Sequence, residues 1–319
     1  MSLTRWISGP LLSVVVVVYR MPAQAERTLR SLSSDYQRGA DARDYEIIVV
    51  ENDSDQLLGP HRACAAAAGV RYFHRVESTS SPVAAVNFGA GQARGRYVAV
   101  MIDGARMLTP GVVRLSLDAL RMDPSGVVAL TGYHLGHRTQ QEAVDAGEHG
   151  EAAEAALLAG IRWPEDGYRL FDVAAFSASA RGGFLLPSPE STYLAMSRHT
   201  WRTLGGMDAR YDIHGGGYVN HDLYKRALQR RGARCYFLFG EGSFHQFHGG
   251  ATTGTPAAER EQICREIIEQ DARLRPDDRS PPSNPPVFFG TLEPPAYRFL
   301  LHSVERAIDS RATSLTATT

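Results

Sequence analysis

An aspartate and two histidines that are far apart in the chain are residue types that bind divalent cations. Asp103 follows the apolar segment YVAVMI and precedes Gly104, which places a carboxylate at the end of an expected buried strand. Such a carboxylate suits a hard cation, since Mg²⁺ and Mn²⁺ need few protein ligands when a phosphorylated substrate supplies oxygens. Either His245 or His248, after a later strand, could complete the coordination. The alternatives are a strand-end turn at Asp103 and packed or solvated histidines.

A second carboxylate lies where a glycine-rich loop enters a helix. The segment runs from Gly215 through Asp222 to Arg226. Asp222 could act as a general base on a mobile loop and take a proton from an acceptor hydroxyl. The competing interpretation is that Asp222 caps the start of the helix.

Polar side chains also follow the first two expected strands. Tyr19 and Arg20 come after the first strand, and Glu51 and Asn52 come after the second. Tyr19 and Arg20 could flank a base or a diphosphate, and Glu51 or Asn52 could accept a hydrogen bond from a base or ribose. The alternative is that the sequence Asn-Asp-Ser, which begins at residue 52, simply forms a turn.

Strands that alternate with helices position these groups. We expect strands at 12–18, 45–50, 70–75, 97–102, 127–131 and 235–239, and helices at 23–34, 63–68, 83–93, 110–120, 143–158, 222–231, 257–274 and 297–308. This alternation predicts right-handed crossovers and a mainly parallel α/β sheet. Ligands of such sheets bind beyond the carboxyl ends of the strands, which directs attention to loops 19–22, 51–55 and 103–106.

Composition excludes several other classes of protein. The chain has 319 residues with a formal net charge of -1, so no basic stripe for nucleic acid or an anionic membrane is expected. Three widely spaced cysteines disfavour a disulfide framework and fit a reducing, cytoplasmic location. Glycine-rich fingerprints of kinases and dehydrogenases, and the Gly-x-Ser-x-Gly elbow of esterases, do not occur in the sequence.

The longest apolar run is residues 11–18, too short for a transmembrane segment. Arg5 before the run and the Ala-Gln-Ala triplet at 23–25 would also fit a signal peptide. Five consecutive valines favour a buried strand instead.

In this order, the segments resemble those of family 2 glycosyltransferases of GT-A fold. The resemblance covers residues 12 to about 248 and rests on SVVVVVY, IIVVENDS, the Asn-x-Gly and Ala-x-Gly pairs at 87–95, the Asp-x-Asp metal motif, here Asp103-Gly-Ala105, and LGGMDARY at 204–211. It implies a metal-dependent enzyme that moves a sugar from a nucleotide-diphosphate sugar to a hydroxyl acceptor. The donor-binding residues that it implies are Val18, Tyr19, Arg20, Glu51, Asn52, Asn87, Asp103 and Gly104.

Two positions depart from the family's pattern. Ala105 stands at the third position of the metal motif, so the resemblance assigns the cation to Asp103 and His248, with His245 as the fallback. An imidazole ligand favours Mn²⁺ over Mg²⁺. The family's usual base position falls on Asn220, which cannot act as a base, and Asp222 is the nearest candidate. The sequence therefore leaves the anomeric outcome open.

The resemblance also divides the chain. Residues 1–275 form the expected GT-A domain, with a nucleotide-binding half at 12–132, an acceptor-side half at 133–250, and a proline-rich arm and tail at 276–319. An insertion at 134–195, with His134, Glu190 and Tyr193, is expected to shape the acceptor pocket. The acceptor is expected to be a small molecule or lipid-linked. A sugar nucleotidyltransferase and a non-catalytic nucleotide-sugar-binding module are the rival functions.

Overall fold

The structure, a computed structural model, describes residues 9–76, 81–148, 150–276 and 285–316. Its strands are β1 (Leu12–Val18), β2 (Tyr45–Asn52), β3 (Val70–Arg75), β4 (Tyr97–Met101), β5 (Arg106–Leu108), β6 (Val127–Leu135), β7 (Ala174–Phe176), β8 (Tyr193–Ser197), β9 (Cys235–His245) and β10 (Val287–Phe289). Its α-helices are α1 (Pro22–Leu32), α2 (Gly59–Ala66), α3 (Val83–Gly91), α4 (Val112–Met122), α5 (Gln140–Asp145), α6 (Glu151–Gly160), α7 (Arg198–Leu204), α8 (Val219–Gln229), α9 (Ala257–Leu274) and α10 (Tyr297–Thr316).

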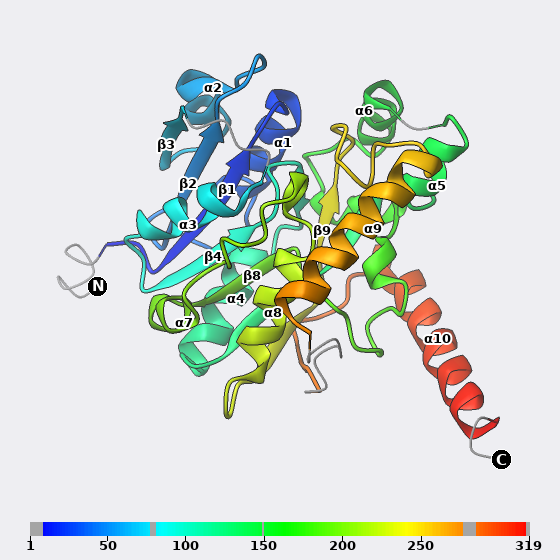
Figure 1. Cartoon of the computed structure of the whole chain (residues 1–319). Coiled ribbons are helices and arrows are strands. Elements are labelled where there is room, and N and C mark those ends of the chain that lie inside the picture. Colours follow the sequence, from blue (N-terminus) through cyan, green and yellow to red (C-terminus); the bar gives the residue numbers. More distant parts are fainter. Residues whose placement is uncertain (1–8, 77–80, 149, 277–284, 317–319) are drawn as a thin grey trace.

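Within these described ranges the strands form one mixed sheet in the order β10-β9-β6-β8-β4-β1-β2-β3, with β5 and β7 paired to β9 and β6 (Figure 1). β4, β1, β2 and β3 are parallel to one another, as are β6, β9 and β10. β8 lies between β4 and β6 and is antiparallel to both. The carboxyl ends of the parallel strands therefore meet at one edge, where the amino end of β8 also lies.

Helices cover both faces of this sheet. All seven residues of β1 are buried, which accounts for the unbroken run of valines. Val14, Val16 and Val18 pack with residues of α1 and α4, whereas Val15 and Val17 pack with residues of α3, α7 and α8. The expected fold class, a mainly parallel α/β sheet flanked by helices, is confirmed. Within the described ranges, no helix is both long enough and apolar enough to cross a membrane.

Several expected boundaries were wrong. β2 continues through Glu51 and Asn52, which were expected in a turn, and β9 has 11 residues rather than five and ends at His245. The helix expected at 143–158 is two helices, and Thr139 and Glu142 form a capping box at the start of α5. The region expected as a proline-rich arm contributes β10, which pairs with β9, and α10 buries Phe299. Residues 277–284 of that arm lie outside the described residues.

Candidate metal site

The short strand β5 brings the loop after β4 to the end of β9. β5 runs antiparallel to β9 with Arg106 opposite His245, and the Gln246 N–H donates to the Ala105 carbonyl at 2.8 Å. A Cβ on Gly104 would come within 2.7 Å of the Val17 carbonyl oxygen, so glycine lets this loop lie against β1. Asp103 is thereby held beside the carboxyl end of β9.

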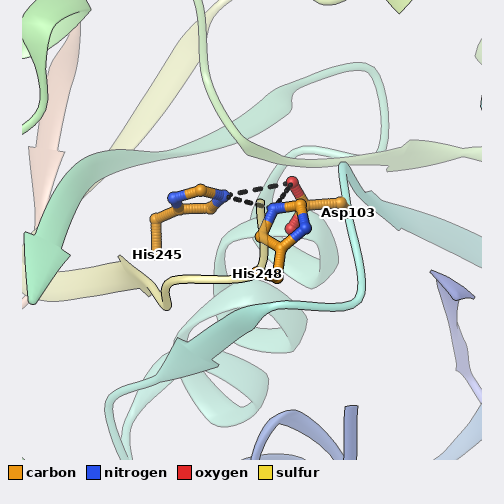
Figure 2. Close-up of side chains that lie close together, drawn as sticks. All are labelled: Asp103, His245 and His248. Carbon is orange, nitrogen blue, oxygen red and sulfur yellow. Dashed lines mark hydrogen bonds and ion pairs between the residues drawn. The ribbon is translucent and has the colours of Figure 1, made fainter. Parts of the chain in front are cut away.

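Asp103, His245 and His248 converge at this edge of the sheet (Figure 2). Asp103 Oδ2 lies 3.3 Å from His245 Nε2 and 3.5 Å from His248 Nε2, and the two Nε2 atoms are 3.0 Å apart. The backbone turns sharply after His248, where Gly249 has a φ of 75°. One oxygen and two nitrogens thus face a common point, which is the donor set of a divalent cation site.

Gln140, on α5, sets the tautomer of His245. Its Nε2 amide donates to the His245 carbonyl at 3.0 Å and to Glu154 Oε1 at 3.3 Å. Its Oε1 must therefore accept from His245 Nδ1, 2.5 Å away. With the proton on Nδ1, the lone pair of Nε2 points toward Asp103, as a metal ligand requires.

The electrostatics favour the protonation states that bind metal. Burial lowers the pKa of His245 to about 4, because it disfavours the imidazolium, so this ring is neutral at pH 7. Although burial would raise it, the pKa of Asp103 lies well below the usual range, and the Arg106 guanidinium, 3.9 Å from Oδ1, is the permanent positive charge beside it. A neutral imidazole therefore faces an ionised carboxylate. A cation between them would stabilise this pairing of two electron-pair donors, so the residues fit a divalent metal.

The three residues expected to shape the acceptor pocket lie in different environments. His134 is opposite His245 in the β6–β9 ladder, and its Nδ1 accepts from the Gln140 N–H at 2.8 Å. Tyr193 is fully buried, and its hydroxyl pairs with Ser116 at 3.0 Å, so the prediction that Tyr193 contacts an acceptor was wrong. Glu190 precedes β8 at the same edge as Asp103. Of the three, Glu190 alone is partly exposed at that edge.

Asp222 does not present a free carboxylate to a cleft. Its side chain is 1% exposed, Oδ2 accepts from Arg226 Nε at 2.8 Å, and Oδ1 accepts from Arg275 Nε at 2.7 Å. A carboxylate enclosed by two guanidinium groups is a structural ion pair. The assignment of Asp222 as general base is therefore corrected, and the alternative of a helix cap is also wrong because no side-chain cap bond forms on α8.

Several of the residues expected to bind the nucleotide also form hydrogen bonds with other residues of the protein instead. Glu51 is fully buried and accepts from the Leu58 and Gly59 N–H groups at 2.7 and 3.0 Å, so it shapes the β2–α2 loop rather than meeting a ligand. Asn87 donates to the Met207 carbonyl and accepts from the Met207 N–H, both at 2.9 Å.

Asn52 is almost fully buried, as is Val18 within β1. Tyr19 and Arg20 follow β1 at the edge where Asp103 lies, and Arg20 pairs with Asp55 at 3.0 Å. Tyr19, Arg20 and Asp103 are therefore the residues of the expected donor site that are exposed or partly exposed at this edge.

Sequence reasoning missed Gln140 and Arg106. Arg106 is only three residues from Asp103, but its place opposite His245 depends on the pairing of β5 with β9. No local spacing in the sequence connects Gln140 with His245. The capping box Thr139-x-x-Glu142 would have predicted the start of α5, and so the position of Gln140, but not its partner.

Comparisons with known proteins bear on the family and the fold. Residues 13–140 match the family model described as glycosyl transferase family 2. No curated protein matches the chain.

Among solved structures, the mannosyltransferase PcManGT from Pyrobaculum calidifontis, in complex with GDP-Man and Mn²⁺, is 16% identical with a TM-score of 0.52, over 98% of this chain and 76% of that one. TarS 1-349 from S. aureus, in complex with UDP, is 13% identical with a TM-score of 0.51, over 83% of this chain and 72% of that one. A longer S. aureus TarS structure is 11% identical with a TM-score of 0.50, over 82% of this chain, which spans only 43% of that protein.

At these identities the solved structures show a shared fold alone, and the family match gives the sequence relationship. The match ends at residue 140, before either histidine and before Glu190. The expected resemblance is confirmed: residues 13–140 carry the glycosyl transferase family 2 sequence pattern, on a chain with the GT-A fold.

Proposed function

We propose that this protein transfers a sugar from a nucleotide-diphosphate sugar to a hydroxyl acceptor, with a divalent cation held by Asp103, His245 and His248. The observation that carries the proposal is the convergence of these three donor atoms, all within 4.8 Å of one another, at the carboxyl edge of the sheet. Ligands of open α/β sheets bind at that edge. The family match and the shared fold also support a sugar-transfer activity.

The chain's own residues would bind and orient the donor. Asp103 and the two histidines would hold the cation, which would supply positive charge against the diphosphate as it departs. Tyr19 and Arg20 would lie beside the nucleotide at the end of β1. Two imidazoles and one carboxylate favour Mn²⁺ over Mg²⁺, which prefers oxygen ligands.

The donor's base and sugar and the class of acceptor are open to direct test. The purified chain would be incubated with Mn²⁺ and a panel containing GDP-mannose and UDP-sugars, and the released products would be separated by ion-exchange chromatography. Nucleoside diphosphate is the expected product. Release of pyrophosphate from sugar phosphate and nucleoside triphosphate would instead indicate a nucleotidyltransferase. Donor binding without release of nucleoside diphosphate would indicate a non-catalytic module.

A further inference from the structure

The described site lacks a base at either position where the sequence places one. Asn220 cannot take a proton, and both oxygens of Asp222 are paired with arginines. Transfer to a hydroxyl by inversion needs a group that accepts the hydroxyl proton. The base must therefore come from another element if these residues catalyse such a transfer.

Glu190 is placed beside Asp103 by the pairing of β4 with β8. These strands are antiparallel, with Met101 opposite Tyr193, and the Ile102 N–H donates to the Thr192 carbonyl at 3.3 Å. Antiparallel pairing brings the residues that follow β4 next to those that precede β8. Asp103 follows β4 and Glu190 precedes β8, so both carboxylates lie at the same edge of the sheet.

The carboxylate of Glu190 is held in a polar setting. Oε2 accepts from Asn220 Nδ2 at 2.7 Å and lies 3.6 Å from His221 Nε2, while the side chain stays 19% exposed. Burial would raise the pKa of Glu190, but His221, Ser179, Asn220 and Arg106 together hold it below its usual value. Glu190 is therefore ionised at neutral pH and is both oriented and accessible.

Two buried polar atoms on residues that interact with the Glu190 carboxylate have no hydrogen-bond partner within the described part of the chain. They are Arg106 Nη1, a donor, and Asn220 Oδ1, an acceptor. Arg106 Nε is 3.9 Å from Asp103 Oδ1, and the charge of Arg106 also contributes to the lowered pKa of Glu190. Buried polar atoms are nearly always satisfied, so this pair indicates a ligand that both donates and accepts hydrogen bonds.

We propose that Glu190 is the catalytic base of this site and that Asn220 and His221 orient it. Arg106 donates to a hydroxyl or phosphate oxygen of the substrates, and Asn220 Oδ1 accepts from a substrate hydroxyl. This assignment rests on the proposed sugar transfer. Glu190 takes the proton of the acceptor hydroxyl as the acceptor oxygen bonds to the anomeric carbon. The bond from that carbon to the β-phosphate oxygen breaks, and its electron pair leaves with the nucleoside diphosphate. The protonated Glu190 then returns its proton to water.

The position of Glu190 explains why an asparagine, Asn220, is tolerated at the family's base position. An aspartate at residue 220 would set a second carboxylate against Glu190, whereas the Asn220 amide donates to Glu190 at 2.7 Å. The base has thus moved from α8 to the segment before β8, and residue 220 orients it. Inversion of the anomeric centre is the stereochemical consequence.

Water serves as the test acceptor, because the natural acceptor need not be known. Glu190→Gln, Glu190→Ala and the exposed control Glu165→Gln would be compared with the wild type for Mn²⁺ affinity, affinity for GDP-mannose and UDP-sugars, and release of nucleoside diphosphate by hydrolysis. Glu190→Gln is expected to lower the hydrolysis rate by roughly 100-fold or more with Mn²⁺ and donor affinities within about twofold of wild type. Glu165→Gln should match the wild type.

Added formate should restore part of the rate to Glu190→Ala but not to the wild type, because a small carboxylate can replace the missing base. The released sugar should have an inverted anomeric centre. Three outcomes would each overturn the assignment while leaving sugar transfer intact. The first is unchanged hydrolysis in Glu190→Gln, and the second is retention of configuration at the anomeric carbon. The third is a loss of rate that follows a loss of donor affinity and is not rescued by formate. A wild type that binds neither Mn²⁺ nor any donor, or binds them without turnover, would overturn the proposed function itself and the base with it.

Discussion

Asp222 and Arg226 lie one helical turn apart on α8 and form an ion pair, with Arg226 Nε and Nη2 each 2.8 Å from Asp222 Oδ2. Arg275 approaches the other oxygen from the end of α9, and Arg226 also donates to the Leu204 and Gly206 carbonyls at 2.8 Å. This network ties α8 and α9 to the loop after α7. Its role is structural, because it holds α8, α9 and this loop together.

The first prediction concerns the stability of this network. Asp222→Asn should lower the free energy of unfolding by about 3 kcal/mol, because it leaves two arginines without a buried counter-charge. Chemical denaturation of both proteins measures the difference. Asp118→Asn is a matched control, since Asp118 and Arg114 have the same i,i+4 spacing but are 38% and 45% exposed.

The control should lose less than about 1 kcal/mol, as exposed ion pairs do. Equal losses in the two variants would show that burial of the Asp222 pair contributes nothing to stability.

The second prediction concerns the stability of the fold at acidic pH. Hydrogen bonds from Arg210, above all, and from Arg275 outweigh burial and lower the pKa of Asp208 in the folded protein. A lowered pKa stabilises the fold at every pH above the ordinary carboxyl value of 3.8, and this stabilisation disappears as the pH falls through the lower, folded value. Asp208→Asn should therefore unfold with a weaker dependence on pH below about pH 4. Urea titrations at several acidic pH values would test this, and parallel curves for the two proteins would contradict it.

The third prediction concerns the support of His245. Gln140→Leu leaves the three proposed metal ligands in place but removes the acceptor that fixes the His245 tautomer. Mn²⁺ affinity should fall by roughly 10- to 100-fold, the usual effect of losing a contact that orients a ligand. Electron paramagnetic resonance of free Mn²⁺ measures the affinity. Gln262→Leu, an exposed change on α9, should leave it unaltered.

The fourth prediction concerns the ligands themselves. His248→Ala should weaken Mn²⁺ binding by more than the roughly 10- to 100-fold expected from a lost supporting contact. It is a cleaner test than His245→Ala, because the His245 side chain is 3% exposed and its hydrogen bond to Gln140 also contributes to stability. His61→Ala, an exposed change on α2, is the control. Full Mn²⁺ affinity in His248→Ala would remove this residue from the metal site.

The sequence predicted the sheet better than the site, and the reason is physical. Runs such as Leu12–Val18 are buried on both faces, so composition alone marks them as core strands. Asp103 was predicted because it ends such a run. Its closeness to His245 depends on β5, whose three residues are too few to form a recognisable pattern.

Contacts between residues far apart in the sequence explain why some residues were misassigned. Asp222 has the residue type of a base, but Arg275, 53 positions later, closes its exposed side. Glu51 has the residue type of a ribose ligand, but the Leu58 and Gly59 amides use it instead. Glu190 was expected only to shape the acceptor pocket, since its closeness to Asp103 follows from the antiparallel insertion of β8 into a sheet that the sequence predicted as mainly parallel.

The proposed metal cluster joins segments separated by 142 positions, because Asp103 follows β4 and His245 ends β9. A cation at this cluster can bind only after both halves of the sheet have assembled, so it selects the complete fold over any partly folded form. At a free concentration 100 times its Kd, such a ligand would add about 2.7 kcal/mol to the free energy of unfolding. Metal supply would then set the lifetime and abundance of the protein as well as its chemistry.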